Sequence, residues 1–89
     1  HQKGRIPASN KLSDEVSMVE MHVPDTWVGK SLIELDLRGR YGINVIAIKE
    51  GENVTIEMNP QEPLRAGQTL GIVGKNEILS RLSETNYQD

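Results

Sequence analysis

Two arginines and an asparagine lie within a short segment that contains two glycines, and their side chains are well suited to bind a ligand. Arg38 and Arg40 follow an apolar helical pattern, and Asn44 precedes a run of aliphatic residues. The planar guanidinium group of arginine can donate two hydrogen bonds to one phosphate. The asparagine amide offers one donor and one acceptor, which suits a hydrogen-bonding edge such as that of adenine. Arg38 alone also fits a purely structural interpretation, since a cation at the end of a helix interacts favourably with the helix dipole.

The elements on either side of this segment are predicted to be a helix and a buried strand. Ser31, followed three residues later by Glu34, is the reciprocal capping pattern that begins a helix. Apolar residues then recur at helical spacing, at Leu32, Ile33, Leu35 and Leu37. Gly39 and Gly42 are expected to end the helix because glycine readily adopts positive φ. The aliphatic run from residue 45 to 48 follows, and it is typical of a buried strand.

The whole pattern predicts an α+β domain with a small mixed sheet and two helices, in the order β-α-β-β-β-α. Strands are expected at residues 16–23, 45–49, 54–58 and 70–74, and a closing helix is expected from Asn76 with Ile78, Leu79 and Leu82 on its buried face. The second and third strands are separated by a short turn and should form a hairpin. Residues 1–15 are predicted to be a flexible linker or tail, residues 16–84 the domain, and residues 85–89 a frayed end.

Composition argues against several classes of protein. The chain has 89 residues, a net charge of −3 and no cysteine, which excludes a disulfide scaffold and a thiolate metal site. The negative charge argues against a nucleic-acid partner, because binding to phosphates needs a basic surface. The apolar runs are far shorter than the roughly 20 residues of a membrane span, and no secretory segment is evident. We therefore expect a cytoplasmic module that does not insert into a membrane.

No set of residues suits catalysis or metal binding. Residues 29–31 (G-K-S) resemble the end of a phosphate-binding loop, but Pro24 stands where that loop requires its first glycine. The sequence has two histidines, His22 and the terminal His1, which are too few for a zinc site or a nucleophilic triad. The carboxylates are scattered over segments expected to be solvated. We therefore predict no catalytic residue, no metal site and no enzymatic activity.

Four blocks of the sequence resemble an RCK C-terminal (TrkA-C) domain. They are M-V-E-M-H-V-P at 18–24, G-K-S-L-I-E-L-D-L-R at 29–38, Y-G-I-N-V-I-A-I-K at 41–49 and L-R-A-G-Q-T-L-G-I-V-G at 64–74. The resemblance covers about residues 16–83. It implies a two-fold homodimer that acts as a regulatory ligand sensor in potassium-channel gating subunits or cation antiporters. The implied partner, reached through the rest of the parent protein, is a membrane cation channel or transporter subunit.

The resemblance is closest to Ktr-type gating subunits and to antiporters of Gram-positive bacteria, several of which bind cyclic di-AMP between two such domains. In those proteins an arginine after an L-x-L-D-[IL]-R helix meets the phosphates, and the asparagine of Y-G-[IC]-N meets adenine. These positions are Arg38 and Asn44 in this sequence, and Leu32, Leu37 and Val45 match apolar contact positions. The resemblance therefore implies cyclic di-AMP as a regulatory ligand and implies no cofactor.

Three departures from the family pattern leave an alternative open. Gly39 and Gln68 stand where alanine and aspartate are more usual, and the loop at 59–64 looks short. The alternative is a TrkA-C oligomerisation module that senses another small anion or nucleotide, or no ligand. The chain has no G-x-G-x-x-G pattern, so binding of NAD or ATP by this segment is not implied.

Overall fold

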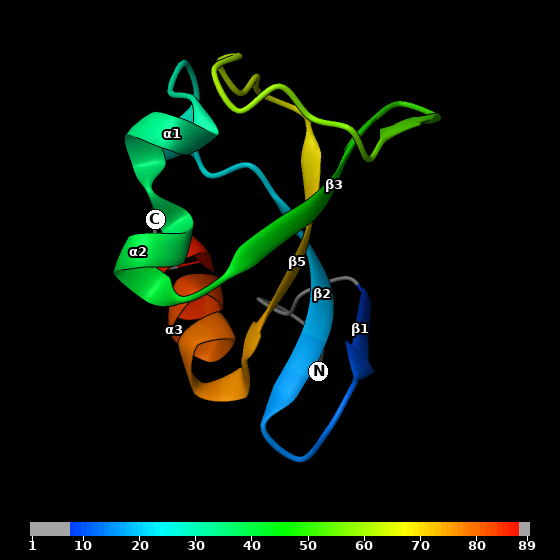
Figure 1. The fold of residues 1–89 in the computed structure, drawn as a ribbon, viewed down its shortest axis with the longest axis vertical. Coiled ribbons are helices and arrows are strands. Elements are labelled where there is room, and N and C mark those ends of the chain that lie inside the picture. The colour runs from blue at the N-terminus through cyan, green and yellow to red at the C-terminus, as the bar shows by residue number, and fades with distance from the viewer. Residues whose placement is uncertain (1–7, 88–89) are drawn as a thin grey trace.

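A five-stranded sheet is the central element of the structure, a computed structural model that describes residues 8–87 (Figure 1). Its strands are β1 (Ala8–Lys11), β2 (Val16–His22), β3 (Asn44–Glu50), β4 (Asn53–Thr55) and β5 (Thr69–Lys75), in the spatial order β1-β2-β5-β3-β4. The predicted α+β class is confirmed. All four pairings are antiparallel, so the prediction of a mixed sheet was wrong in the direction of the strands. The reason is that β5 returns between β2 and β3 and runs opposite to both.

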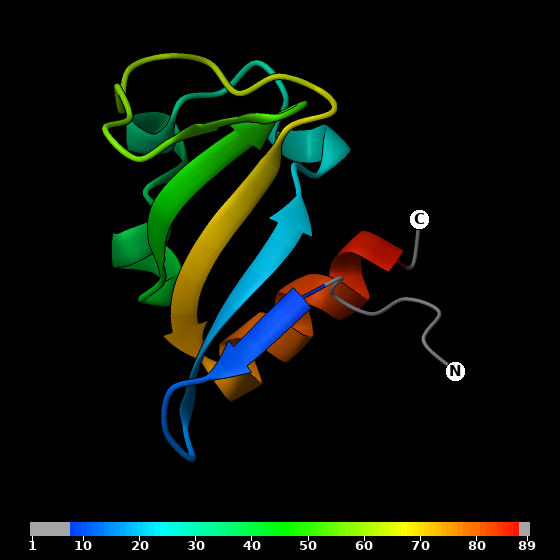
Figure 2. The ribbon, with the colours of Figure 1, turned by 90° about the vertical axis from the view of Figure 1, so that its right-hand side faces the viewer.

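The helices lie together on one side of this sheet and leave its other face uncovered (Figures 1 and 2). They are the single 3-10 turn η1 (Asp25–Trp27) and the helices α1 (Leu32–Leu35), α2 (Leu37–Tyr41) and α3 (Asn76–Tyr87). Buried positions in β2 alternate accordingly, at Val19 and Met21, and Val23 just after the strand is buried as well. The most deeply buried side chains are Ile43, Leu70 and Ile72, with at most 1% of their surface exposed.

The helix predicted between residues 31 and 37 is two short helices joined at Asp36. The predicted capping box is confirmed, since the Ser31 hydroxyl accepts from the Glu34 N–H and the Glu34 carboxylate accepts from the Ser31 N–H. Asp36 has a left-handed conformation (φ 48°, ψ 50°), which ends α1 and begins α2. Gly42 (φ 70°) ends α2 as predicted. Gly39 does not end a helix and lies inside α2, which corrects the expectation for that glycine.

Three other boundaries differ from the sequence-based predictions. Part of the predicted linker forms β1, because residues 8–11 pair with residues 17–20 of β2. Residues 1–7 lie outside the described part of the chain. The predicted hairpin of β3 and β4 is confirmed, but β4 ends at Thr55 and does not reach Met58. Helix α3 continues to Tyr87, past the expected domain limit at residue 84, and the frayed end expected at residues 85–89 stays a prediction.

Candidate functional site

Arg38 and Asn44, the two polar residues singled out in the sequence, are joined by a direct hydrogen bond. Nε of Arg38 donates to Oδ1 of Asn44 over 3.0 Å, and both side chains are exposed. Within the described residues no other group bonds the guanidinium of Arg38, so its two terminal nitrogens remain available. The Nδ2 group of Asn44 likewise has no partner among those residues. The pair therefore presents a group of hydrogen-bond donors to solvent, which is the arrangement that an anionic ligand requires.

The fold fixes both members of this pair. Asn44 is the first residue of β3 and lies opposite Val73 of the central strand β5. It follows Ile43, whose side chain is 1% exposed, and the left-handed Gly42 reverses the chain between α2 and β3. Arg38 lies in the first turn of α2, six residues before Asn44. A tight connection between a helix and a strand thus brings a guanidinium and an amide together.

The three apolar residues predicted to contact the ligand lie at different depths. Leu32 on α1 and Val45 on β3 are half-buried and pack against the core, so part of each remains accessible. Leu37 is 4% exposed and belongs to the core itself. In this arrangement Leu32 and Val45 have surface left for a ligand, whereas Leu37 supports the helix that carries Arg38.

Arg40 is directed differently from Arg38. Its guanidinium carbon lies 5.5 Å from the centroid of the Tyr41 ring, a cation–π contact. Side chains two residues apart on a helix do not face each other. Arg40 is therefore separated from the Arg38–Asn44 pair.

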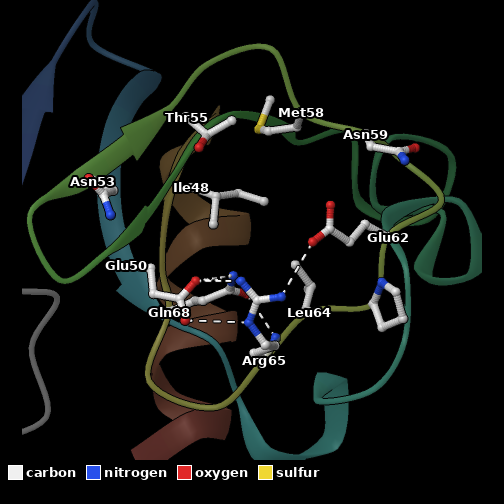
Figure 3. Close-up of a pocket in the computed structure, with 11 residues that line it drawn as sticks. Ile48, Glu50, Asn53, Thr55, Met58, Asn59, Glu62, Leu64, Arg65 and Gln68 are labelled. Atoms are coloured by element: carbon white, nitrogen blue, oxygen red, sulfur yellow. Dashed lines mark hydrogen bonds and ion pairs between the residues drawn. The ribbon is translucent and has the colours of Figure 1, made fainter.

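A pocket of about 260 Å³ lies at the opposite end of β3 from Asn44, between the β3–β4 hairpin and the loop that leads to β5 (Figure 3). Its walls include apolar and charged side chains, among them Ile48, Met58, Leu64, Glu50, Glu62 and Arg65. No motif in the sequence indicates this pocket. The partners lie up to 18 residues apart in sequence, so no local spacing pattern indicates that they meet.

Arg65 is the centre of the polar network in this pocket. Its guanidinium pairs with Glu50 at 2.5 Å and with Glu62 at 3.3 Å, and all three side chains are about half-exposed. The buried amide of Gln68 donates to Glu50 and accepts from the backbone N–H of Arg65. The hydrogen bond from Arg65, assisted by the one from Gln68, lowers the pKa of Glu50 below its ordinary value of 4.5. The same interaction raises the pKa of Arg65. The network fastens the loop to the end of β3.

This network predicts a specific pH dependence of stability. Because the pKa of Glu50 is lower in the folded state, its ionised form favours folding above the unfolded-state pKa, and this contribution is lost as pH falls through the folded-state value. We expect Arg65→Met and Glu50→Gln both to weaken the acid dependence of the free energy of unfolding. Urea unfolding of the three proteins between neutral pH and about pH 3 measures this. An acid dependence identical to that of the wild type in both variants would contradict the assignment.

Neither a metal site nor a membrane span is found in the described part of the chain. No group of three or more histidine, cysteine, aspartate or glutamate side chains gathers there. The Nδ1 atom of His22 lies 3.2 Å from the Thr69 hydroxyl on the exposed side of the sheet. Among residues 8–87, no helix has the length and hydropathy that crossing a bilayer requires.

Comparison with protein families and curated sequences gives consistent matches. The family model for the TrkA-C domain matches residues 16–85. Ktr system potassium uptake protein C of Bacillus subtilis (strain 168) is 34% identical over 74 residues, which cover 83% of this chain and 34% of that protein. The chain therefore spans about a third of the length of this relative.

Several solved structures are also similar to this chain. The RCK C domain of the potassium transport protein KtrA, in complex with cyclic di-AMP, matches with a TM-score of 0.74 and 40% identity, over 83% of this chain and 87% of that one. An RCK_C domain dimer of S. agalactiae BusR, also with cyclic di-AMP, has a TM-score of 0.63 at 22% identity, over 78% of this chain and 92% of that one. BusR has also been solved with promoter DNA, with a TM-score of 0.66 and 22% identity over 91% of this chain and 40% of that one. The BusR likeness shows the fold alone, so the expectation of no nucleic-acid partner stays a prediction.

Proposed function

The chain belongs to the TrkA-C domain family, and from this premise we propose that it is a cytoplasmic regulatory domain that binds cyclic di-AMP at the interface of a two-fold dimer. The parent protein would modulate a membrane channel or transporter for potassium or another cation. No catalytic step is part of this role. The observation that carries the proposal is the Arg38–Asn44 hydrogen bond, because it forms a donor site for a phosphate and a base at the positions that the family resemblance indicates.

The chemistry of the ligand matches the chemistry of this pair. The terminal nitrogens of Arg38 can donate two parallel hydrogen bonds to phosphate oxygens. The Nδ2 group of Asn44 can donate to a ring nitrogen of the adjacent base. The half-exposed apolar surfaces of Leu32 and Val45 can cover the face of that base. The 40% identity to a domain solved with cyclic di-AMP supports the same ligand.

A dimer accounts for the second half of the ligand. Cyclic di-AMP has two phosphates and two adenines related by a two-fold axis, and an isologous interface presents each protomer's Arg38 and Asn44 once to each half. A ligand that contacts both protomers stabilises one relative orientation of them over others. The attached transport protein would respond to that orientation because the ligand has different affinities for the two states.

Calorimetric titration with cyclic di-AMP tests this function directly. We expect one ligand per dimer, with the dimer measured by light scattering on the same sample. Cyclic di-GMP and ATP should compete at least about 10-fold less well, since one mismatched polar group in a buried site commonly costs a factor of that order. Tighter binding of another of these nucleotides, or a dimer that binds none of them, would favour the alternative of a sensor for another ligand or a pure oligomerisation module.

A further inference from the structure

Asp36 has a backbone conformation that demands an explanation. Among residues 8–87 it is the only residue other than glycine with positive φ. The left-handed region costs an ordinary residue roughly 1–2 kcal/mol, and Asp and Asn tolerate it better because their short side chains can bond locally. Such residues persist where the surrounding structure fixes them, and they concentrate at ligand sites. Asp36 lies two residues before Arg38.

Three hydrogen bonds hold Asp36 between the two short helices. Its N–H donates to the Leu32 carbonyl at 3.0 Å, which ends α1. Its carbonyl accepts from the Arg40 N–H at 2.9 Å, which begins α2. Its carboxylate oxygen Oδ1 accepts from the Gly39 N–H at 3.3 Å. The carboxylate therefore lies over the first turn of α2, where a negative charge also interacts favourably with the helix dipole.

Gly39 leaves the space that this carboxylate occupies. A Cβ atom added at residue 39 would lie 2.6 Å from Oδ2 and 2.7 Å from Oδ1 of Asp36. Both separations are shorter than van der Waals contact allows, so an alanine there would have to displace the carboxylate. Alanine is the more usual residue here in the family that the sequence resembles, so the fold accommodates such a displacement, and Gly39 permits the carboxylate position observed in this structure.

The orientation of Arg38 depends on this arrangement. Helix α2 has five residues, too few for its own hydrogen bonds to hold it firmly. Its rotation is set at one end by Asp36 and at the other by Gly42, with Leu37 in the core. A change at Asp36 would rotate the first turn of α2 and move Arg38 away from Asn44.

We propose that Asp36 is a positioning residue for ligand binding. Asp36 does not touch the ligand. It holds the first turn of α2 in the rotation that places Nε of Arg38 on Asn44 and leaves the terminal nitrogens of Arg38 exposed. The effect on affinity rests on the proposed cyclic di-AMP site, whereas the effect on Arg38 itself can be measured in the free protein.

The free protein provides the first measurement. In ¹H–¹⁵N spectra we expect the Arg38 Nε–H resonance of the wild type to exchange slowly with solvent, because it is bonded to Asn44. Asp36→Ala should lose this protection, and Asp36→Asn should keep it, since asparagine tolerates the left-handed region and can accept from the Gly39 N–H. Unchanged protection in Asp36→Ala would overturn the proposal whether or not the protein binds cyclic di-AMP.

Affinity provides the second measurement, at a temperature where every variant is folded. Asp36→Ala should raise the Kd for cyclic di-AMP about 10-fold or more, because a smaller fraction of molecules then has Arg38 in the binding orientation. Asp36→Asn should remain within about threefold of the wild type. Ser13→Ala serves as the control, because it removes a hydroxyl that accepts from two backbone N–H groups at the β1–β2 turn, and its Kd should not change.

The same titrations separate the positioning role from the ligand site itself. A Kd of Asp36→Ala equal to that of the wild type would overturn the positioning role while leaving cyclic di-AMP binding in place. A wild type without affinity would overturn the proposed function and the affinity half of this proposal together.

Discussion

Replacement of Arg38 by alanine is expected to lower the affinity for cyclic di-AMP by at least about 100-fold with little change in stability. A hydrogen bond that involves a charged group contributes roughly 1.5–3 kcal/mol, and each dimer would lose an arginine from both halves of the ligand. A loss of about 3–6 kcal/mol corresponds to a factor of roughly 10² to 10⁴ in Kd. The folded state should tolerate the change because Arg38 is exposed. Calorimetric titration and thermal unfolding of the same samples measure the two effects.

Arg40→Ala is the matched control for this prediction. It removes the same charge two residues further along α2, from a side chain that contacts the Tyr41 ring and not Asn44. Its affinity should stay within about threefold of the wild type, since an exposed charge at a distance acts weakly and is screened by salt. Equal losses for both variants would indicate a diffuse electrostatic attraction. An unchanged affinity for Arg38→Ala would place the ligand elsewhere on the domain.

Replacement of Ile72 by alanine is expected to destabilise the domain by about 3–5 kcal/mol. Ile72 has none of its surface exposed. It lies on the central strand β5, opposite Val19 of β2 and Val45 of β3. The truncation leaves a cavity that regular strand pairing on both sides cannot close. A domain of this length has a total stability of roughly 4–13 kcal/mol, so the variant should be largely unfolded under mild denaturing conditions.

Ile56→Ala makes the same chemical change on the surface. Ile56 is 71% exposed, and its truncation should alter the free energy of unfolding by no more than about 0.5 kcal/mol. Urea unfolding of both variants should be compared at one protein concentration, because the proposed dimer would make apparent stability depend on concentration. A small effect at Ile72, or comparable effects at the two positions, would show that the core is not centred on β5.

The sequence predicted features that depend on neighbouring residues. The capping box of Ser31 and Glu34 and the helix-ending Gly42 are confirmed, because each depends on hydrogen bonds or backbone freedom within one turn. The strand predicted at residues 16–23 is confirmed as β2, and Val19 and Met21 are both buried because a strand with one covered face has a period of two. Arg38 and Asn44 were selected by chemical type and by the family resemblance, and the structure places them in hydrogen-bond contact.

Tertiary structure decided the features that depend on residues distant in sequence. The polar segment 8–11 forms β1 because it pairs with the edge of β2. No pattern inside the segment predicts this pairing. The network of Glu50, Arg65 and Gln68 forms because two loops meet at one end of the sheet. The left-handed turn at Asp36 is stabilised locally by the hydrogen bond that its carboxylate accepts from the Gly39 N–H. It is also favoured by the core, since the turn lets Leu35 and Leu37 both be buried. Burial against distant strands therefore fixed the direction of Arg38, and helical periodicity alone could not supply that information.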